Sequence, residues 1–154
     1  MREVRQFFNG VVENVFYSDL GVCNPEPVEY FSELLSSYVH VDDLFPFGEN
    51  RKVVSIDRLF ERATSKESKR QLCRYIGDFT IFWTGLYPEN IKNLASTGLG
   101  FSKRDFANRG QEFYLRAARL STDKQKPPHH LLKNISNHYD DYMQGLSLCR
   151  QEFC

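Results

Sequence analysis

The sequence has no excess of charge of either sign, because 20 lysines and arginines balance 20 aspartates and glutamates. A neutral chain lacks the broad electrostatic attraction with which proteins bind nucleic acids or anionic membranes. It also has no run of the roughly 20 apolar residues that a membrane-spanning helix needs. Residues 1–12 mix charged and apolar side chains, so the continuous apolar core of a signal peptide is missing. We therefore expect a cytoplasmic protein that does not bind membranes, and nucleic acid is an unfavoured partner.

The sequence also lacks a Cys-x-x-Cys motif. The four cysteines, none of which belongs to a Cys-x-x-Cys pair, are Cys23, Cys73, Cys149 and Cys154. In the absence of a secretory signal we interpret them as reduced thiols. Cys73 falls inside an apolar helical pattern, which predicts a small core residue, and the terminal Cys154 is expected to be exposed.

Signatures of metal, phosphate and nucleophile sites are missing as well. The four histidines do not form the Glu-x-x-His pairs that hold metal ions in helical bundles. His138 and Asp141 on their own lack the further ligands that a metal site requires. The Gly-rich stretch 94–100 lacks the Lys and Thr that follow in a phosphate-binding loop, and no strand–turn–helix elbow exposes a nucleophile. We therefore predict neither a metal nor a cofactor.

What the sequence has in abundance is aromatic residues, with 13 Phe, 8 Tyr and 1 Trp. Such side chains bury large areas and favour a tightly packed core. Apolar residues recur at steps of three and four, the period of an amphipathic helix. This periodicity predicts helices over 2–19, 25–40, 55–63, 65–87, 103–120 and 128–150. Pro, Gly and Asn interrupt the pattern at 41–54, where we expect a loop anchored by Leu44, Phe45 and Phe47. The predicted fold is all-α, a single-domain bundle of about five to six helices spanning residues 1–154.

The segment 65–87 is predicted to be the central helix of this bundle. Its apolar face consists of Leu72, Ile76, Phe79, Trp83 and Leu86. The preceding Thr64-Ser65-Lys66-Glu67 has the spacing of a capping box with Thr64 as the cap, and Pro88 ends the helix. Because Gly77 and Gly110 fall on the apolar sides of their helices, we expect them to mark a close crossing of 65–87 with 103–120.

An aspartate in the middle of this apolar helix is costly to bury unless it is paired. Asp78 lies one turn after Arg74, so an ion pair within the helix is available. Two interpretations follow: a structural carboxylate that pairs with Arg74 or bonds the end of a neighbouring helix, or a functional carboxylate whose pKa is perturbed by burial. Asp78 and Arg74, together with Trp83 and Tyr87 of the same segment, are our four candidate binding residues.

The same segment also contains a combination of residues that is similar to a known sequence motif. Gly77-Asp78-Phe79, an aromatic pair and Gly85-Leu86-Tyr87-Pro88-Glu89 occur within residues 74–89. This stretch resembles a motif of uncharacterised bacterial helical proteins. The resemblance implies a bacterial source and carries over no activity.

A second resemblance concerns the C-terminal helix. Lys133-Asn134-Ile135-Ser136-Asn137-His138 resembles the Arg-Asn-x-x-x-His signature of HEPN-type helical ribonucleases. It would assign general acid–base work on RNA to His138 and a positioning role to Asn134. Lys133 stands where the signature has arginine, so the planar fork that stabilises phosphate is absent at this position.

Composition and pattern together favour a non-enzymatic binding or regulatory protein. Its expected partner is another protein or a second copy of the chain. An interface is expected if the core cannot hold all of the aromatic residues Phe7, Phe8, Phe16, Tyr30 and Tyr38. Two alternatives remain open. One is the HEPN-like ribonuclease that uses His138, and the other is a small-ligand-binding domain with an aromatic pocket near Trp83.

Overall fold

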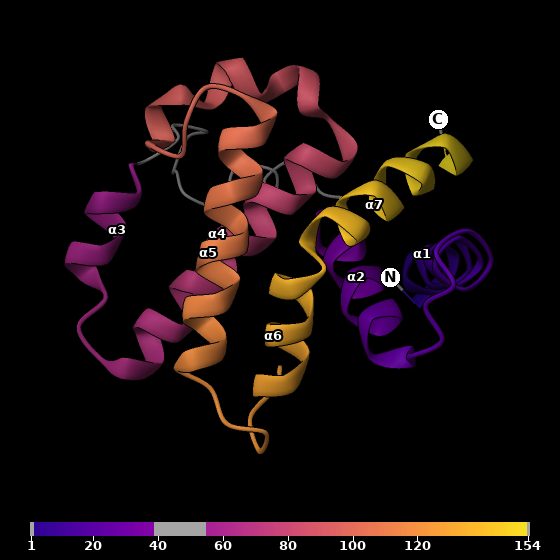
Figure 1. The fold of residues 1–154 in the computed structure, drawn as a ribbon, viewed down its shortest axis with the longest axis horizontal. Coiled ribbons are helices and arrows are strands. Elements are labelled where there is room, and N and C mark those ends of the chain that lie inside the picture. Colours follow the sequence, from indigo (N-terminus) through magenta and orange to yellow (C-terminus); the bar gives the residue numbers. More distant parts are fainter. Residues whose placement is uncertain (1, 39–54, 154) are drawn as a thin grey trace.

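The computed structural model describes residues 2–38 and 55–153, and within these ranges the chain is helical without strands (Figure 1). Its α-helices are α1 (Arg2–Asn14), α2 (Pro25–Ser37), α3 (Ile56–Arg62), α4 (Lys66–Leu86), α5 (Lys103–Arg119), α6 (His129–Asn137) and α7 (Tyr139–Phe153). A π-helical turn, η1 (Val15–Asp19), extends α1, and a 3₁₀ segment, η4 (Pro88–Thr97), leads from α4 toward α5. The all-α prediction is confirmed. The described residues form slightly more helices than the five to six predicted.

Local sequence signals explain where the helices begin. The side-chain oxygen of Asn24 accepts a hydrogen bond from the backbone N–H of Glu26 at 3.0 Å, so Asn24 caps α2 as expected. At α4 the capping box is formed by Ser65 and Ser68, each of which accepts the other's backbone N–H at 3.0 Å. The prediction that Thr64 is the cap was therefore wrong by one residue.

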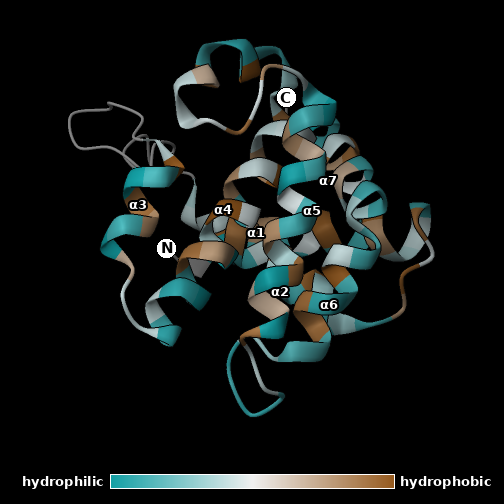
Figure 2. Ribbon diagram, turned by 60° about the vertical axis from the view of Figure 1, so that its left-hand side comes forward, coloured by the Kyte–Doolittle hydropathy of each residue, from teal (hydrophilic) through white to brown (hydrophobic). Residues whose placement is uncertain are grey.

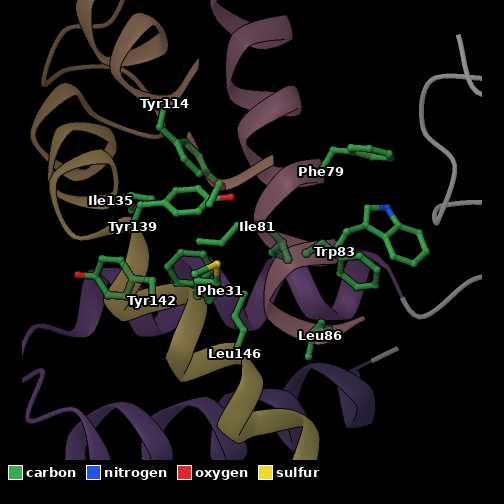
Figure 3. Close-up of a cluster of buried hydrophobic side chains, with 14 of the residues drawn as sticks. Phe31, Phe79, Ile81, Trp83, Leu86, Tyr114, Ile135, Tyr139, Tyr142 and Leu146 are labelled. Atoms are coloured by element: carbon green, nitrogen blue, oxygen red, sulfur yellow. The ribbon is translucent and has the colours of Figure 1, made fainter. Parts of the chain in front are cut away.

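Helix α4 is the centre of the bundle, as predicted. Every residue from Ile76 to Leu86 is buried. Phe79 and Trp83 lie on one side of α4, and Tyr139 and Tyr142 lie on the other (Figure 3). Hydrophobic residues gather where the helices face one another, and hydrophilic residues cover their outer sides (Figure 2). Neighbouring helices therefore surround the second half of α4.

The expected close crossing of α4 and α5 is confirmed by the two glycines. A Cβ atom at Gly77 would lie 2.8 Å from the Tyr114 ring, and one at Gly110 would lie 2.0 Å from Thr80 Oγ1. The hydroxyl of Tyr139 donates a hydrogen bond to the same Thr80 Oγ1 at 2.9 Å. Each glycine therefore accepts a side chain of the opposite helix against its backbone.

The C-terminal segment differs from the prediction, because residues 128–150 form two helices and not one. The chain leaves helical geometry at His138, with φ −119° and ψ 30°. Helix α6 packs mainly on α5, whereas α7 packs on α4 and against η1 (Figure 1). One straight helix could not present its apolar stripe to both sets of neighbours, and the break at His138 allows this.

A buried arginine anchors the loop between α5 and α6. Arg70 on α4 is only 2% exposed. Its Nε donates to Ser121 Oγ at 2.6 Å, and its Nη2 donates to the carbonyl oxygen of Pro127 at 2.8 Å. The loop is thereby tied to the first half of the central helix.

A surface histidine links α2 to the same loop. His130 Nε2 lies 2.8 Å from Glu26 Oε1, and His130 Nδ1 lies 2.9 Å from Asp123 Oδ1. The hydrogen bond to Glu26, followed by that to Asp123, raises the pKa of His130. The charged form of this imidazole is therefore favoured by folding.

The remaining expectations concern the loop at 41–54, the cysteines and membrane-spanning helices. The loop predicted at 41–54, with Leu44, Phe45 and Phe47, lies outside the described residues, as does Cys154. Cys73 is buried, as expected for a small core residue. Within residues 2–38 and 55–153, no helix combines the length and apolar character needed to cross a membrane.

Candidate functional site

Asp78 lies at a junction of three helices. Its Oδ1 accepts hydrogen bonds from the hydroxyl of Tyr30 on α2 at 2.5 Å and from the hydroxyl of Tyr114 on α5 at 2.6 Å. Its Oδ2 lies 3.8 Å from Nε of Arg74, one turn earlier on α4. The ion pair expected within the helix is present. The two tyrosine donors were not predicted, and they connect Asp78 to neighbouring helices.

The electrostatics of this cluster follow from burial. Burial raises the pKa of the Asp78 carboxyl, while the charge of Arg74 and the two tyrosine hydrogen bonds oppose that rise. Burial also raises the pKa of both Tyr30 and Tyr114 well above the ordinary value, and the charge of Asp78 adds to the effect. Both phenols therefore stay protonated and act as fixed hydrogen-bond donors.

Arg74 is the exposed member of the cluster. Its Nε donates to the hydroxyl of Tyr30 at 3.3 Å, and its Nη1 donates to Gln71 Oε1 at 3.2 Å. Among the described residues, Nη2 has no hydrogen-bond partner. The side chain is 36% exposed. One end of the guanidinium is therefore held in place while the other retains open donors.

Arg74 lines a cleft, which we call the Arg74 cleft, between the end of α2 and the first half of α4. The cleft has a volume of about 380 Å³ and is lined by Ser37, Tyr38, Gln71, Leu72, Arg74, Tyr75 and Asp78. A second cleft of about 410 Å³ shares Arg74 in its wall. Glu26, Glu29 and Glu33 of α2 also line this second cleft, which we call the glutamate cleft.

Two of the four predicted binding residues line the Arg74 cleft, and the other two line neither cleft. Asp78 and Arg74 line the Arg74 cleft, as described above. Trp83 is only 5% exposed and packs in the core (Figure 3). Its ring centre lies 5.3 Å from that of Phe82. The ring of Tyr87 lies 4.8 Å from the guanidinium carbon of Arg150. Neither of these two aromatic residues lines the Arg74 cleft or the glutamate cleft.

Sequence reasoning missed the tyrosines that build the Arg74 cleft. Tyr38 lines it and stacks on Phe82 with ring centres 4.5 Å apart and an interplanar angle of 19°. Tyr75 lines it as well and is 37% exposed. The position of Tyr75 one residue after Arg74 was a usable signal. No pattern linked Tyr30 or Tyr114 to Asp78, since they lie 48 and 36 residues away along the chain.

The residues of the ribonuclease resemblance lie elsewhere, where α6 meets α7. The side-chain oxygen of Asn134 accepts a hydrogen bond from the hydroxyl of Tyr142 at 2.5 Å. The His138 side chain is 54% exposed, and its Nδ1 lies 3.7 Å from Asp141 Oδ2. Lys133 is exposed. The structure therefore gives Asn134 a packing partner across the helix break and leaves the other two side chains at the surface.

Comparison of the chain with protein-family models, with curated proteins and with solved structures finds no significant match. In the residues that the structure describes, no three or more His, Cys, Asp or Glu side chains are grouped so that they could hold a metal ion. The function is therefore inferred from the geometry around Arg74 and Asp78.

Proposed function

We propose that this chain is a non-enzymatic ligand-binding domain and that the Arg74 cleft is its binding site. The observation that carries the proposal is Arg74 itself, an arginine fixed by Tyr30 and Gln71 with open donors in the wall of a cleft. Pockets for small ligands have volumes of roughly 300–1,000 Å³ and combine apolar walls with a few placed polar groups. The Arg74 cleft has this size and this composition.

The state of Asp78 supports binding over catalysis. A general acid or base must exchange a proton with a substrate, which requires an accessible oxygen. Oδ1 of Asp78 already accepts two tyrosine hydroxyls, and Oδ2 faces Arg74. The Asp78 side chain is only 11% exposed. We infer that this carboxylate positions Tyr30, Tyr114 and Arg74, while Arg74 contacts the ligand.

The proposal places the domain in a reducing compartment, the cytoplasm of a bacterial cell. The free thiols of Cys73 and Cys149, both buried, support this location. A protein partner or a homodimer is the alternative to a small ligand. Among the described residues, the exposed aromatic side chains outside the Arg74 cleft are Phe7 and Tyr17, both on the continuous α1–η1 segment, and Phe101, just before α5.

A screen of small molecules tests the proposed site without assuming the ligand's chemistry. The full chain is screened by thermal shift against a fragment library that contains cations, neutral molecules and anions, and each hit is titrated by calorimetry. Hits are repeated with Tyr75→Ala, which alters the Arg74 cleft, and with Tyr17→Ala, a matched control. These tyrosines are 37% and 38% exposed, and Tyr17 lies outside the cleft.

We expect a set of hits whose affinity falls at least about tenfold in Tyr75→Ala and is unchanged in Tyr17→Ala. If no fragment depends on Tyr75, the Arg74 cleft is not a ligand site and the proposal is wrong. Light scattering over a concentration series then tests the alternative, because a homodimer would show a mass that rises with concentration.

A further inference from the structure

We infer that the ligand of the Arg74 cleft is a small molecule that carries an oxyanion, a carboxylate or a phosphate ester, on a flat apolar group. This inference rests on the proposed function and specifies the chemistry of the same site. Three features of the described residues support it: the open donors of Arg74, the distribution of acidic side chains between the two clefts, and the tyrosine rings in the cleft wall.

Arg74 is prepared to receive an oxyanion. A guanidinium has five N–H donors in a planar fork, and paired donors match the two oxygens of a carboxylate or phosphate. The contacts of Arg74 with Tyr30 and Gln71 use one donor on Nε and one on Nη1. The donors that remain are on Nη1 and Nη2, the pair that forms such a fork. Because Nε is held by Tyr30, little rotamer freedom is lost when the anion binds.

The acidic side chains direct the anion to one of the two clefts. The glutamate cleft has Glu26, Glu29 and Glu33 in its wall, and beside the shared Arg74 only Lys126 opposes them, so the excess of negative charge disfavours an anion there. Among the described residues that line the Arg74 cleft, Asp78 is the only acidic one, and its side chain is 11% exposed. Its charge is offset by Arg74 and by two tyrosine donors. The Arg74 cleft is therefore the side of Arg74 on which an anion is stabilised.

The same arrangement disfavours a cationic ligand in the Arg74 cleft. A cation would need an accessible acidic oxygen. Oδ1 of Asp78 accepts the hydroxyls of Tyr30 and Tyr114, and Oδ2 lies 3.8 Å from Arg74 Nε on a side chain that is only 11% exposed. Arg74 would also repel a cation at close range. An anion gains a charge-assisted hydrogen bond at this position, whereas a cation gains none.

The remaining wall of the cleft fits a flat apolar group. Tyr38, Tyr75 and Leu72 supply rings and an aliphatic side chain around Arg74. The Tyr38 ring is held in place because it stacks on the Phe82 ring, with ring centres 4.5 Å apart. Aromatic rings bind flat groups by offset or edge contacts, and a ring that is already fixed loses little conformational freedom on binding.

The test compares acids with amides of the same shape on the full chain. Benzoate, cinnamate and indole-3-acetate are titrated by calorimetry beside benzamide, cinnamamide and indole-3-acetamide, and phenyl phosphate is added as a second kind of oxyanion. We expect at least one acid to bind with a Kd below about 1 mM and its amide to bind about 10- to 100-fold more weakly. Comparison of phenyl phosphate with benzoate shows which oxyanion the fork prefers.

Variants of Arg74 assign the effect to the guanidinium. Arg74→Gln should abolish the preference for acids, and Arg74→Lys should retain only part of it, because an ammonium lacks the planar fork. Arg109→Gln is the matched control, since Arg109 is 37% exposed, pairs with Glu112 and lies 5.1 Å from the Phe113 ring. Thermal unfolding of each variant verifies that it folds. If Arg74→Gln does not fold, Arg74→Lys decides, because it keeps the charge beside Asp78.

Three results would overturn the inference: equal binding of acids and amides, acid binding that is unchanged in the Arg74 variant used, and no binding by any member of the panel. The fragment screen separates this failure from failure of the proposed function. Hits that depend on Tyr75 but are neutral or cationic would refute the anionic ligand and leave the binding site in place. An absence of hits that depend on Tyr75 would refute both.

Discussion

Gly110→Ala should destabilise the protein, although alanine normally favours a helix over glycine. At an unhindered helix position this change stabilises by about 1 kcal/mol. At Gly110 the new Cβ would lie 2.0 Å from Thr80 Oγ1 and 2.6 Å from the hydroxyl of Tyr139. Overpacking of a tight core costs about 1–3 kcal/mol. Disruption of the buried Tyr139–Thr80 hydrogen bond adds about 1–3 kcal/mol. The expected net loss is about 1–5 kcal/mol.

Urea denaturation followed by circular dichroism measures this loss directly, and the melting temperature should fall by about 2–20 °C. The matched control is Gly10→Ala in α1, where a Cβ meets nothing within 4 Å. It should stabilise the protein by up to about 1 kcal/mol. Adding Thr80→Ala to Gly110→Ala removes the closest contact and should cost less than the sum of the two single changes. A Gly110→Ala variant as stable as the parent would refute the close crossing of α4 and α5.

Three further predictions follow from buried or paired charges. Asp78→Ala leaves two buried tyrosine hydroxyls without their acceptor and should cost about 2–5 kcal/mol in urea denaturation; Asp140→Ala, which removes an exposed pair with Arg104, should cost less than about 1 kcal/mol. Arg70→Met should cost about 2–3 kcal/mol and speed proteolysis within residues 121–128, and an unchanged cleavage rate would contradict the anchoring role. The raised pKa of His130 stabilises the fold below about pH 6.5, and this contribution is lost as pH rises through the folded pKa. The stability gap between the parent and His130→Gln should therefore be wider near pH 6 than near about pH 9, and a gap independent of pH would count against the link.

Local signals in the sequence were sufficient for most of the helices. The apolar period of the central segment, together with Pro88 after it, predicted a helix within one residue of the observed Lys66–Leu86. Asn24 and Pro25 marked the start of α2 because their capping chemistry acts within a few residues. The break at His138 was not predictable in this way. Residues 128–150 have a helical period on both sides of it, and only the neighbours of α6 and α7 require two directions.

In the candidate site, too, local contacts were predictable and contacts between helices were not. The sequence alone determined that Asp78 needs a partner and that Arg74 lies one turn away, because helical spacing relates residues four apart. It did not determine which residues would hold Asp78 from other helices. The apolar period already placed Trp83 on the core side of its helix, but nothing in the sequence showed that Tyr38 and Tyr75 would line the Arg74 cleft. Those outcomes depend on contacts between residues far apart in the chain, which exist only when α2, α4 and α5 have packed together.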